Sequence, residues 1–225
     1  ALAAAVALGL AAVALRPTVA AAQGGPTAPT RVALIQMPYN GERNVAELSD
    51  NPAYLYEHGI ADTIRSMGFT LAPSRTVALS AQQEKEYGAW HRVALANGNL
   101  AGMVAENRRA GTLTVGLLAN CTSLLGMLGG LQRSGAPGDT LDVGLLCIDA
   151  HGDFNTPETT LSGMLGGMPV AVAAGMGLHN LRRDSGLEWG IPTRSMVMAA
   201  VRDLDPLERE LVEAHQAAYA ESAAE

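Results

Sequence analysis

The sequence has few of the residues that mark several common kinds of site. Of its 225 residues only two are cysteines, Cys121 and Cys147, and neither belongs to a C-x-x-C pair. A zinc ribbon and a thioredoxin-type redox motif are therefore excluded. Charged residues make up 16% of the chain and the net charge is −7, which argues against a nucleic-acid partner. No internal repeat is visible.

Long apolar runs are also scarce. The longest, residues 1–15, is too short to span a membrane comfortably. Arg16 ends it, and the small residues Ala20-x-Ala22 then supply a cleavage-site composition, so residues 1–22 are predicted to be part of a secretory signal peptide followed by a linker over 23–30. This predicts a secreted or periplasmic protein without a membrane partner once the signal is removed. The alternative is an Ala-rich helix of a cytoplasmic mature protein.

The remaining residues, 31–225, are predicted to form one α/β domain. The chain is 48% hydrophobic, which is typical of a globular protein with a substantial core. Strand-like and helix-like segments alternate, which indicates βαβ units and a mainly parallel sheet between two layers of helices. Strands are expected at 31–37, 76–79, 113–118, 141–148 and 195–201, and helices at 53–67, 81–110 (broken at Asn97-Gly98), 123–132, 169–177 and 207–223.

One apolar strand runs directly into three potential metal ligands. Residues 143–148 are an unbroken apolar run, typical of a strand buried on both faces, and Asp149, His151 and Asp153 follow. Ligands of parallel sheets bind at the carboxyl ends of strands. In an extended chain Asp149 and Asp153 would lie about 13 Å apart, too far to share an ion, so the chain must turn, and Gly152 is expected to permit the turn.

Two carboxylates and an imidazole suit manganese, iron or zinc better than calcium or magnesium. The alternative for an isolated D-x-H-x-D is a solvated loop whose last Asp caps a helix.

The residues that follow make the interpretation more specific. Residues 149–169 contain D-A-H-x-D, N-T-P, T-x-S-G and G-x-P in this order, and residues 202–208 form R-D-x-D-x-x-E after an apolar strand. This pair of signatures resembles the arginase/agmatinase (ureohydrolase) family, from about Arg31 to Ala217. The resemblance implies a three-layer αβα fold with a mainly parallel sheet. Family members continue to a later S-x-D-x-D, and the sequence has no initiator Met, so it is expected to be truncated at both ends and to lack the C-terminal strands.

The resemblance also implies a ligand set and a reaction. Asp149 would bridge two manganese ions, His151 would bind one and Asp153 the other, and these three residues would be catalytic. A hydroxide held by the metals would attack the guanidinium carbon and release urea. The resemblance also implies a homo-oligomer, a trimer or a hexamer.

Four further residues match the family's substrate-binding positions. Asn155 and Ser162 match the positions that hold an amino-acid carboxylate, and Asp205 and Glu208 match those that hold its α-amino group. The alternatives are local: Asn155-Thr-Pro as simple turn chemistry, and Asp205 with Glu208 as a helix N-cap followed by a first-turn acid.

Three positions depart from the family pattern. Cys121 stands where the family has a histidine ligand, Gly166 where arginases have a proton-shuttling histidine, and Met164 where they have a substrate-contacting asparagine. A thiolate ligand would favour zinc or iron over manganese. The sequence therefore predicts a divergent metal-dependent hydrolase of linear amidines or guanidines. The alternative is a non-catalytic binding protein that keeps the fold but has lost the full metal pair.

The predicted leader gives a first test. Protein expressed with its native leader should be exported and should begin at or near Gln23, because the apolar block is followed closely by the small residues that signal peptidase requires. N-terminal sequencing of the exported protein checks this. Cytoplasmic protein that retains residues 1–22 would contradict it.

Overall fold

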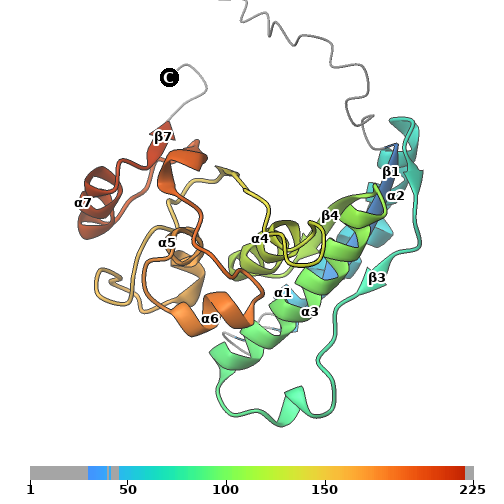
Figure 1. Cartoon of the computed structure of the whole chain (residues 1–225), viewed down its shortest axis with the longest axis horizontal. Coiled ribbons are helices and arrows are strands. Elements are labelled where there is room, and N and C mark those ends of the chain that lie inside the picture. The colour runs from blue at the N-terminus through green and yellow to red at the C-terminus, as the bar shows by residue number, and fades with distance from the viewer. Residues whose placement is uncertain (1–29, 40, 42–45, 221–225) are drawn as a thin grey trace, which may run out of the picture.

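The computed structural model describes residues 30–39, 41 and 46–220 (Figure 1). The predicted signal peptide and nearly all of the predicted linker lie outside these ranges and stay predictions. Within the described residues, no helix has both the length and the apolar character needed to cross a bilayer.

All strand pairs of the described chain are parallel, as predicted. In the first sheet β1 pairs with β2, β3 and β4, and in the second β6 lies between β5 and β7. The strands are β1 (Arg31–Met37), β2 (Thr70–Leu71), β3 (Arg75–Thr76), β4 (Leu113–Leu118), β5 (Leu145–Ile148), β6 (Met196–Ala199) and β7 (Ala218–Ala220).

Helices connect most of these strands and pack against the sheets. Figure 1 shows the first half of the chain on one side of the molecule and α7 with β7 at the opposite side. The α-helices are α1 (Ala46–Leu55), α2 (Ala61–Ser66), α3 (Ala89–Arg109), α4 (Leu124–Gln132), α5 (Pro169–Ala174), α6 (His179–Asp184) and α7 (Pro206–Ala214). Single turns of other helix types are η1 (Tyr56–Ile60), η2 (Gln83–Lys85), η3 (Cys121–Ser123), η4 (Leu165–Gly167) and η5 (Thr193–Ser195).

The strand register decides where the polar loops meet. Met37 at the end of β1 lies opposite Leu118 at the end of β4, and Ile148 at the end of β5 lies opposite Ala199 at the end of β6. Within a sheet the carboxyl ends of parallel strands share one edge, so the loops after β5 and β6 lie at the same edge of the second sheet, whereas the loop after β4 belongs to the first.

Helix α3 contributes to both hydrophobic cores of the described chain. Val93 and Ala94 belong to the larger core, which includes α4, α5 and β6, whereas Leu100 and Val104 pack in the smaller one against β1. The predicted break at Asn97-Gly98 is wrong, because the helix continues through both residues.

These two residues serve helix packing instead of a turn. The Asn97 side chain is fully buried and donates hydrogen bonds to the Thr122 carbonyl oxygen at 3.0 Å and to Ser185 Oγ at 3.3 Å. Gly98 lies so close to α6 that an added Cβ would be 2.7 Å from the Asp184 carbonyl oxygen. Tertiary contacts thus outweigh the turn preference of Asn-Gly.

Helices α3 and α4 approach each other closely because α4 carries glycines on the facing side. A Cβ added to Gly126 would lie 2.7 Å from the Asn97 carbonyl oxygen, and one added to Gly130 would lie 2.5 Å from Val104 Cβ and 2.6 Å from the Ala101 carbonyl oxygen. Side chains three and four residues apart share one face of a helix, so these glycines form a flat contact surface.

Strand β5 differs from the prediction. Leu145 and Cys147 face the core, but Leu146 and Ile148 point outward and are 64% and 73% exposed. The expectation of a strand over 141–148 buried on both faces is therefore wrong, because no described helix covers the outer side of β5.

The predicted helix over 207–223 is also too long. Helix α7 ends at Ala214, Gln216 adopts a positive φ of 51° and the chain then enters β7.

Substitutions at two glycines test the packing of α3 on α4. Gly130→Ala should lower the free energy of unfolding by about 1–3 kcal/mol, because the methyl group meets the backbone and Val104 of α3. Gly102→Ala is the matched control: it lies in α3 with no atom within 4 Å of an added Cβ, so it should raise the free energy of unfolding by up to about 1 kcal/mol. Denaturant titrations measure both, and an equal gain in both variants would contradict the close approach.

Candidate active site

A cavity of about 470 Å³ opens where the loops after β4, β5 and β6 meet. Its lining includes the predicted residues His151, Asp153, Asn155, Ser162, Asp205 and Glu208, together with Cys121. The other lining residues are Ala119, Asn120, Thr160, Met164, Gly166, Gly167 and Asp203. The structure thus gathers almost all sequence-predicted site residues around one space.

Asp149 is the one predicted ligand that does not line the cavity. It contacts His151 instead, through both the backbone and the imidazole. Asp149 Oδ1 accepts a hydrogen bond from the His151 backbone N–H at 3.0 Å and lies 3.4 Å from His151 Nδ1. On its other side His151 Nε2 lies 4.0 Å from Asp203 Oδ2. The imidazole is therefore placed between two carboxylates.

Asp203 was not singled out from the sequence, although it lies in the second signature. It forms a parallel bridge with His151, and its backbone N–H donates to the Ala150 carbonyl oxygen at 3.1 Å. Its position just beyond the predicted strand at 195–201, within the second signature, is the sequence signal that would have found it.

The turn that brings Asp153 toward the site is made by Asp153 itself. Asp153 has a φ of +48°, whereas Gly152 has no positive φ, so the prediction that Gly152 supplies the turn is wrong. Aspartate tolerates this left-handed conformation better than most residues. Gly152 is needed for space: a Cβ there would be 2.5 Å from Leu204 Cδ2 and 3.0 Å from Glu208 Oε1.

Negative charge is concentrated around Asp153. Burial raises the pKa of Asp153 to about 7, and the Asp149 carboxylate adds to the effect. Cys121 as a residue is exposed, but burial of its thiol and the charges of Asp153 and Asp149 raise its pKa to about 11; the thiol also hydrogen-bonds Asp153. Burial and the same carboxylates raise the pKa of Cys147 to about 11. Both cysteines are free thiols.

The second signature forms a capping box at the start of α7, as the local alternative predicts. The Asp205 backbone N–H donates to Glu208 Oε2 at 3.1 Å, and Glu208 is 4% exposed. Its other oxygen, Oε1, accepts from the Phe154 N–H at 2.7 Å. Burial raises the pKa of Glu208, while these two backbone donors lower it.

The two signatures also touch through their polar side chains. Asn155 Nδ2 donates to Asp205 Oδ2 at 3.1 Å, and Asn155 Oδ1 accepts from Thr159 Oγ1 at 2.9 Å. Asn155 is therefore held in a fixed orientation at the cavity wall. The two residues assigned to opposite ends of a substrate lie next to each other.

Another part of the cavity lining is a short polar turn that contains Thr160 and Ser162. It is followed by Met164 and Gly166, two of the positions that differ from the family pattern. Ser162 Oγ accepts from the Met164 N–H at 3.2 Å, and Thr160 Oγ1 accepts from the Gly163 N–H at 3.1 Å. Met164 and Gly166 line the cavity, so this wall carries no titratable group at those two positions.

Carboxylate, imidazole and thiol groups are suitable ligands for a transition-metal ion, but in the structure these side chains lie in two separate pairs. Asp149 lies beside His151, and Asp153 beside Cys121. Within residues 30–39, 41 and 46–220, no three His, Cys, Asp or Glu side chains are grouped closely enough to hold one ion. The predicted cluster of Asp149, His151 and Asp153 is thus not assembled among the described residues, because His151 is 64% exposed at the rim while Asp153 faces Cys121.

Comparison with protein families gives an independent view of the second half of the chain. Residues 113–224 match the model of the arginase family. Arginase from Brevibacillus brevis is 28% identical over 165 residues, covering 72% of this chain and 54% of the relative. N(omega)-hydroxy-L-arginine amidinohydrolase from Streptomyces lavendulae is 38% identical over 107 residues, covering 48% of this chain and 35% of the relative. The chain spans about half the length of the first of these relatives.

Solved structures agree on the fold. Arginase from Bacillus cereus superposes with a TM-score of 0.71 at 21% identity, covering 84% of this chain and 63% of that one. Formiminoglutamase from Trypanosoma cruzi gives a TM-score of 0.56 at 17% identity, with 88% and 61% covered. At these identities the likeness establishes the three-layer α/β fold alone. Since the parallel sheets, the two signatures at one cavity and the matching family model agree, the chain belongs to the arginase family.

Proposed function

We propose that the protein is a metal-dependent hydrolase that cleaves a C–N bond of a linear guanidine or amidine and releases urea or a related product. The observation that carries this proposal is the meeting of the two signatures. Asn155 contacts Asp205 at 3.1 Å and the Phe154 N–H contacts Glu208 at 2.7 Å, both at the wall of one cavity. If Glu208 served only to cap α7, its second oxygen would need no hydrogen bond from Phe154, which lies 54 positions earlier in the chain.

The metal would draw on the two donor pairs, Asp149 with His151 and Asp153 with Cys121, and these pairs would have to approach each other to share one ion. Manganese is the expectation for the family, and a thiolate from Cys121 would shift the preference toward zinc or iron. A bound metal supplies a nucleophile at neutral pH by lowering the pKa of its water. Burial is the main cause of the raised pKa of Asp153, and the Asp149 and Glu208 carboxylates add to it; a bound cation would offset both the burial of the charged form and this repulsion.

Substrate charge would be recognised by the acidic rim. Asp203 and Asp205 line the cavity, and no Lys or Arg is among the residues that the structure places there. These carboxylates favour a cationic guanidinium or amino group. Both oxygens of Glu208 already accept backbone N–H groups, so in this proposal Glu208 orients Asp205 at the cavity wall.

The opposite end of an amino-acid-like substrate would meet Asn155 and Ser162. Asn155 is fixed by Asp205 and Thr159, which leaves its orientation defined before a substrate arrives. Met164 and Gly166 offer no group that could carry a proton, so proton transfer would fall to residues on the His151 side of the cavity.

Loss of the proposed ligands should abolish hydrolysis. With manganese, zinc or iron(II) supplied in turn, the wild-type protein is expected to release urea from arginine-like guanidines, and Asp149→Asn and Asp153→Asn should each lower kcat/KM by at least about 100-fold. Colorimetric urea assays and metal analysis of the same samples measure both effects. The control is Asp139→Asn, an exposed aspartate outside the cavity lining, which should behave as wild type.

The outcomes separate an enzyme from a binding protein. Stoichiometric metal with urea release that depends on Asp149 and Asp153 supports the enzyme. A folded wild-type protein that binds no metal and releases no urea would overturn the proposal and leave a non-catalytic member of the fold.

The reactivity of Cys121 should report the local negative charge. In a Cys147→Ser background with no metal added, alkylation of Cys121 by iodoacetamide should be slow at pH 8 and should accelerate as the pH approaches about 11, because only the thiolate reacts. Asp153→Asn removes a charge and a hydrogen bond that raise this pKa, so the rate at pH 8 should increase. Mass spectrometry of timed samples measures the rates. Equal rates with and without the Asp153 carboxylate would contradict the assigned contact.

A further inference from the structure

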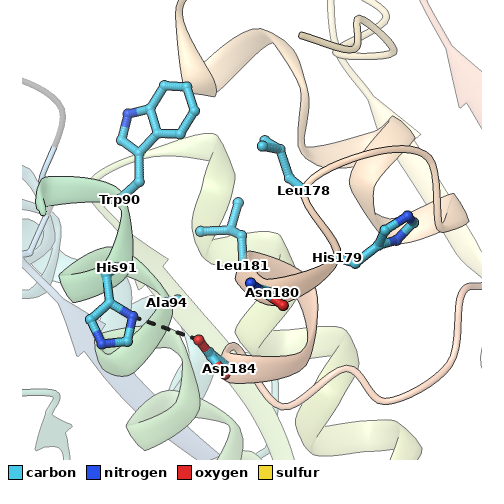
Figure 2. Close-up of a pocket in the computed structure, with 8 residues that line it drawn as sticks. All are labelled: Trp90, His91, Ala94, Leu178, His179, Asn180, Leu181 and Asp184. Atoms are coloured by element: carbon cyan, nitrogen blue, oxygen red, sulfur yellow. Dashed lines mark ion pairs between the residues drawn. The ribbon is translucent and has the colours of Figure 1, made fainter.

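A second cleft lies between the start of α3 and α6, separate from the candidate active site. It has a volume of about 580 Å³, and none of its lining residues is shared with the first cavity. Figure 2 shows Trp90 and His91 on α3 facing Leu178 and α6 across the opening. The lining residues are Trp90, His91, Ala94, Leu178, His179, Asn180, Leu181 and Asp184.

The apolar part of this cleft comes from four of its eight lining residues, and one of the four, Trp90, is aromatic. Trp90 is 40% exposed, and Leu178 and Leu181 lie across from it (Figure 2). Ala94 and Leu181 are almost fully buried and close the floor. An indole that is accessible from one side offers a flat surface for an apolar or cationic group.

Leu178 is held in a conformation that leucine rarely adopts. Its φ and ψ are +40° and +42°, in the left-handed region, and Gly177 before it has a φ of +63°. A strained residue persists only where its surroundings fix it, and such residues cluster at ligand sites. Here the strained backbone presents the leucine side chain to the cleft opposite Trp90 (Figure 2).

At the polar end of the cleft lies the Asp184 carboxylate, whose negative charge is balanced by few basic groups nearby. Among the described residues, the one basic side chain within 4.0 Å of the Asp184 carboxylate is His91, whose Nδ1 lies 3.6 Å from Asp184 Oδ2, beyond hydrogen-bonding distance. His91 Nε2 lies 3.9 Å from Glu86 Oε2, so the imidazole is shared between two acids. The neighbouring Arg183 does not line the cleft and donates to Asn180 Oδ1 at 3.2 Å.

We propose that this cleft binds a small amphipathic organic cation, in which an ammonium or guanidinium group is carried on an apolar body about the size of a phenyl ring. The apolar body would pack between Trp90 and Leu178, and the cationic group would lie beside Asp184. An anion would be repelled by Asp184 and Glu86. A neutral ligand would use the apolar walls but leave the carboxylate unpaired.

A metal ion is a poor alternative occupant. Although His91, Asp184 and Glu86 are close in space, no three such side chains in the described part of the chain are arranged to hold an ion. Trp90, Leu178 and Leu181 also carry no group that would coordinate a metal ion.

The test uses Trp90 as its own reporter. The chain has two tryptophans, so Trp189→Phe leaves Trp90 as the single indole, and Trp189 is 62% exposed outside this cleft. The full chain carrying this substitution is titrated with 2-phenylethylamine, 2-phenylethanol and 3-phenylpropionate while tryptophan fluorescence is followed. Saturable quenching should be strongest for the amine, about fivefold weaker in affinity for the alcohol, and absent for the acid.

A charge variant decides whether Asp184 is the partner. Asp184→Asn in the same background should weaken 2-phenylethylamine binding about fivefold and leave 2-phenylethanol unchanged. Glu210→Gln, which removes an exposed charge on α7, is the matched control and should bind the amine as the parent does. Binding should also survive Asp149→Asn, so this test stands apart from that of the active site.

Three results would overturn the proposal. One is the absence of saturable quenching by any of the three probes in a variant that still melts cooperatively. The second is equal affinity for amine, alcohol and acid, and the third is unchanged amine affinity in Asp184→Asn, since either would show that the carboxylate does not select a cation.

Discussion

The close packing of α3 on its neighbours is the constraint on which the rest of the described structure depends. Glycines of α4 let the two helix backbones approach, and Gly98 of α3 does the same for α6. Through this contact α3 joins two hydrophobic cores. Its buried Asn97 holds the Thr122 carbonyl oxygen and the Ser185 hydroxyl, so the turn that carries Cys121 and the end of α6 are both fixed to one helix. Close-packed protein interiors transmit small displacements, so the geometry of both cavities depends on the position of α3.

The candidate active site combines structural and chemical roles in the same side chains. Glu208 is a buried capping residue whose two oxygens join the second signature to the first. Asp149 orients His151, and Asp205 orients Asn155. Burial raises the pKa of Asp153 and of both cysteines, and the neighbouring carboxylates raise it further. A site with this surplus of negative charge is suited to cations, either a metal ion or a guanidinium group.

The sequence predicted the elements well where periodicity and composition agree. The strands β1, β4 and β6, the parallel arrangement and the helices α4 and α5 lie where the apolar pattern predicts them. It failed where local preference and tertiary contact compete. Asn97-Gly98 has the composition of a turn but lies inside α3, because burial of the amide and close approach to α6 outweigh that preference. The outer face of β5 was expected to be covered, but an apolar run alone cannot show whether a helix lies over it.

By itself, the sequence determined the family resemblance, the order of the two signatures and the types of donor, because motifs are local and their chemistry belongs to the residues that form them. Only the tertiary structure decided that Asp153 and not Gly152 makes the turn, that Asp203 joins the site and that Asn155 contacts Asp205. It also revealed the cleft between Trp90 and Leu178, which no motif marks. The physical reason is that these features depend on distances between segments far apart in the chain. Strand register and helix packing set those distances, and no single stretch of sequence contains either.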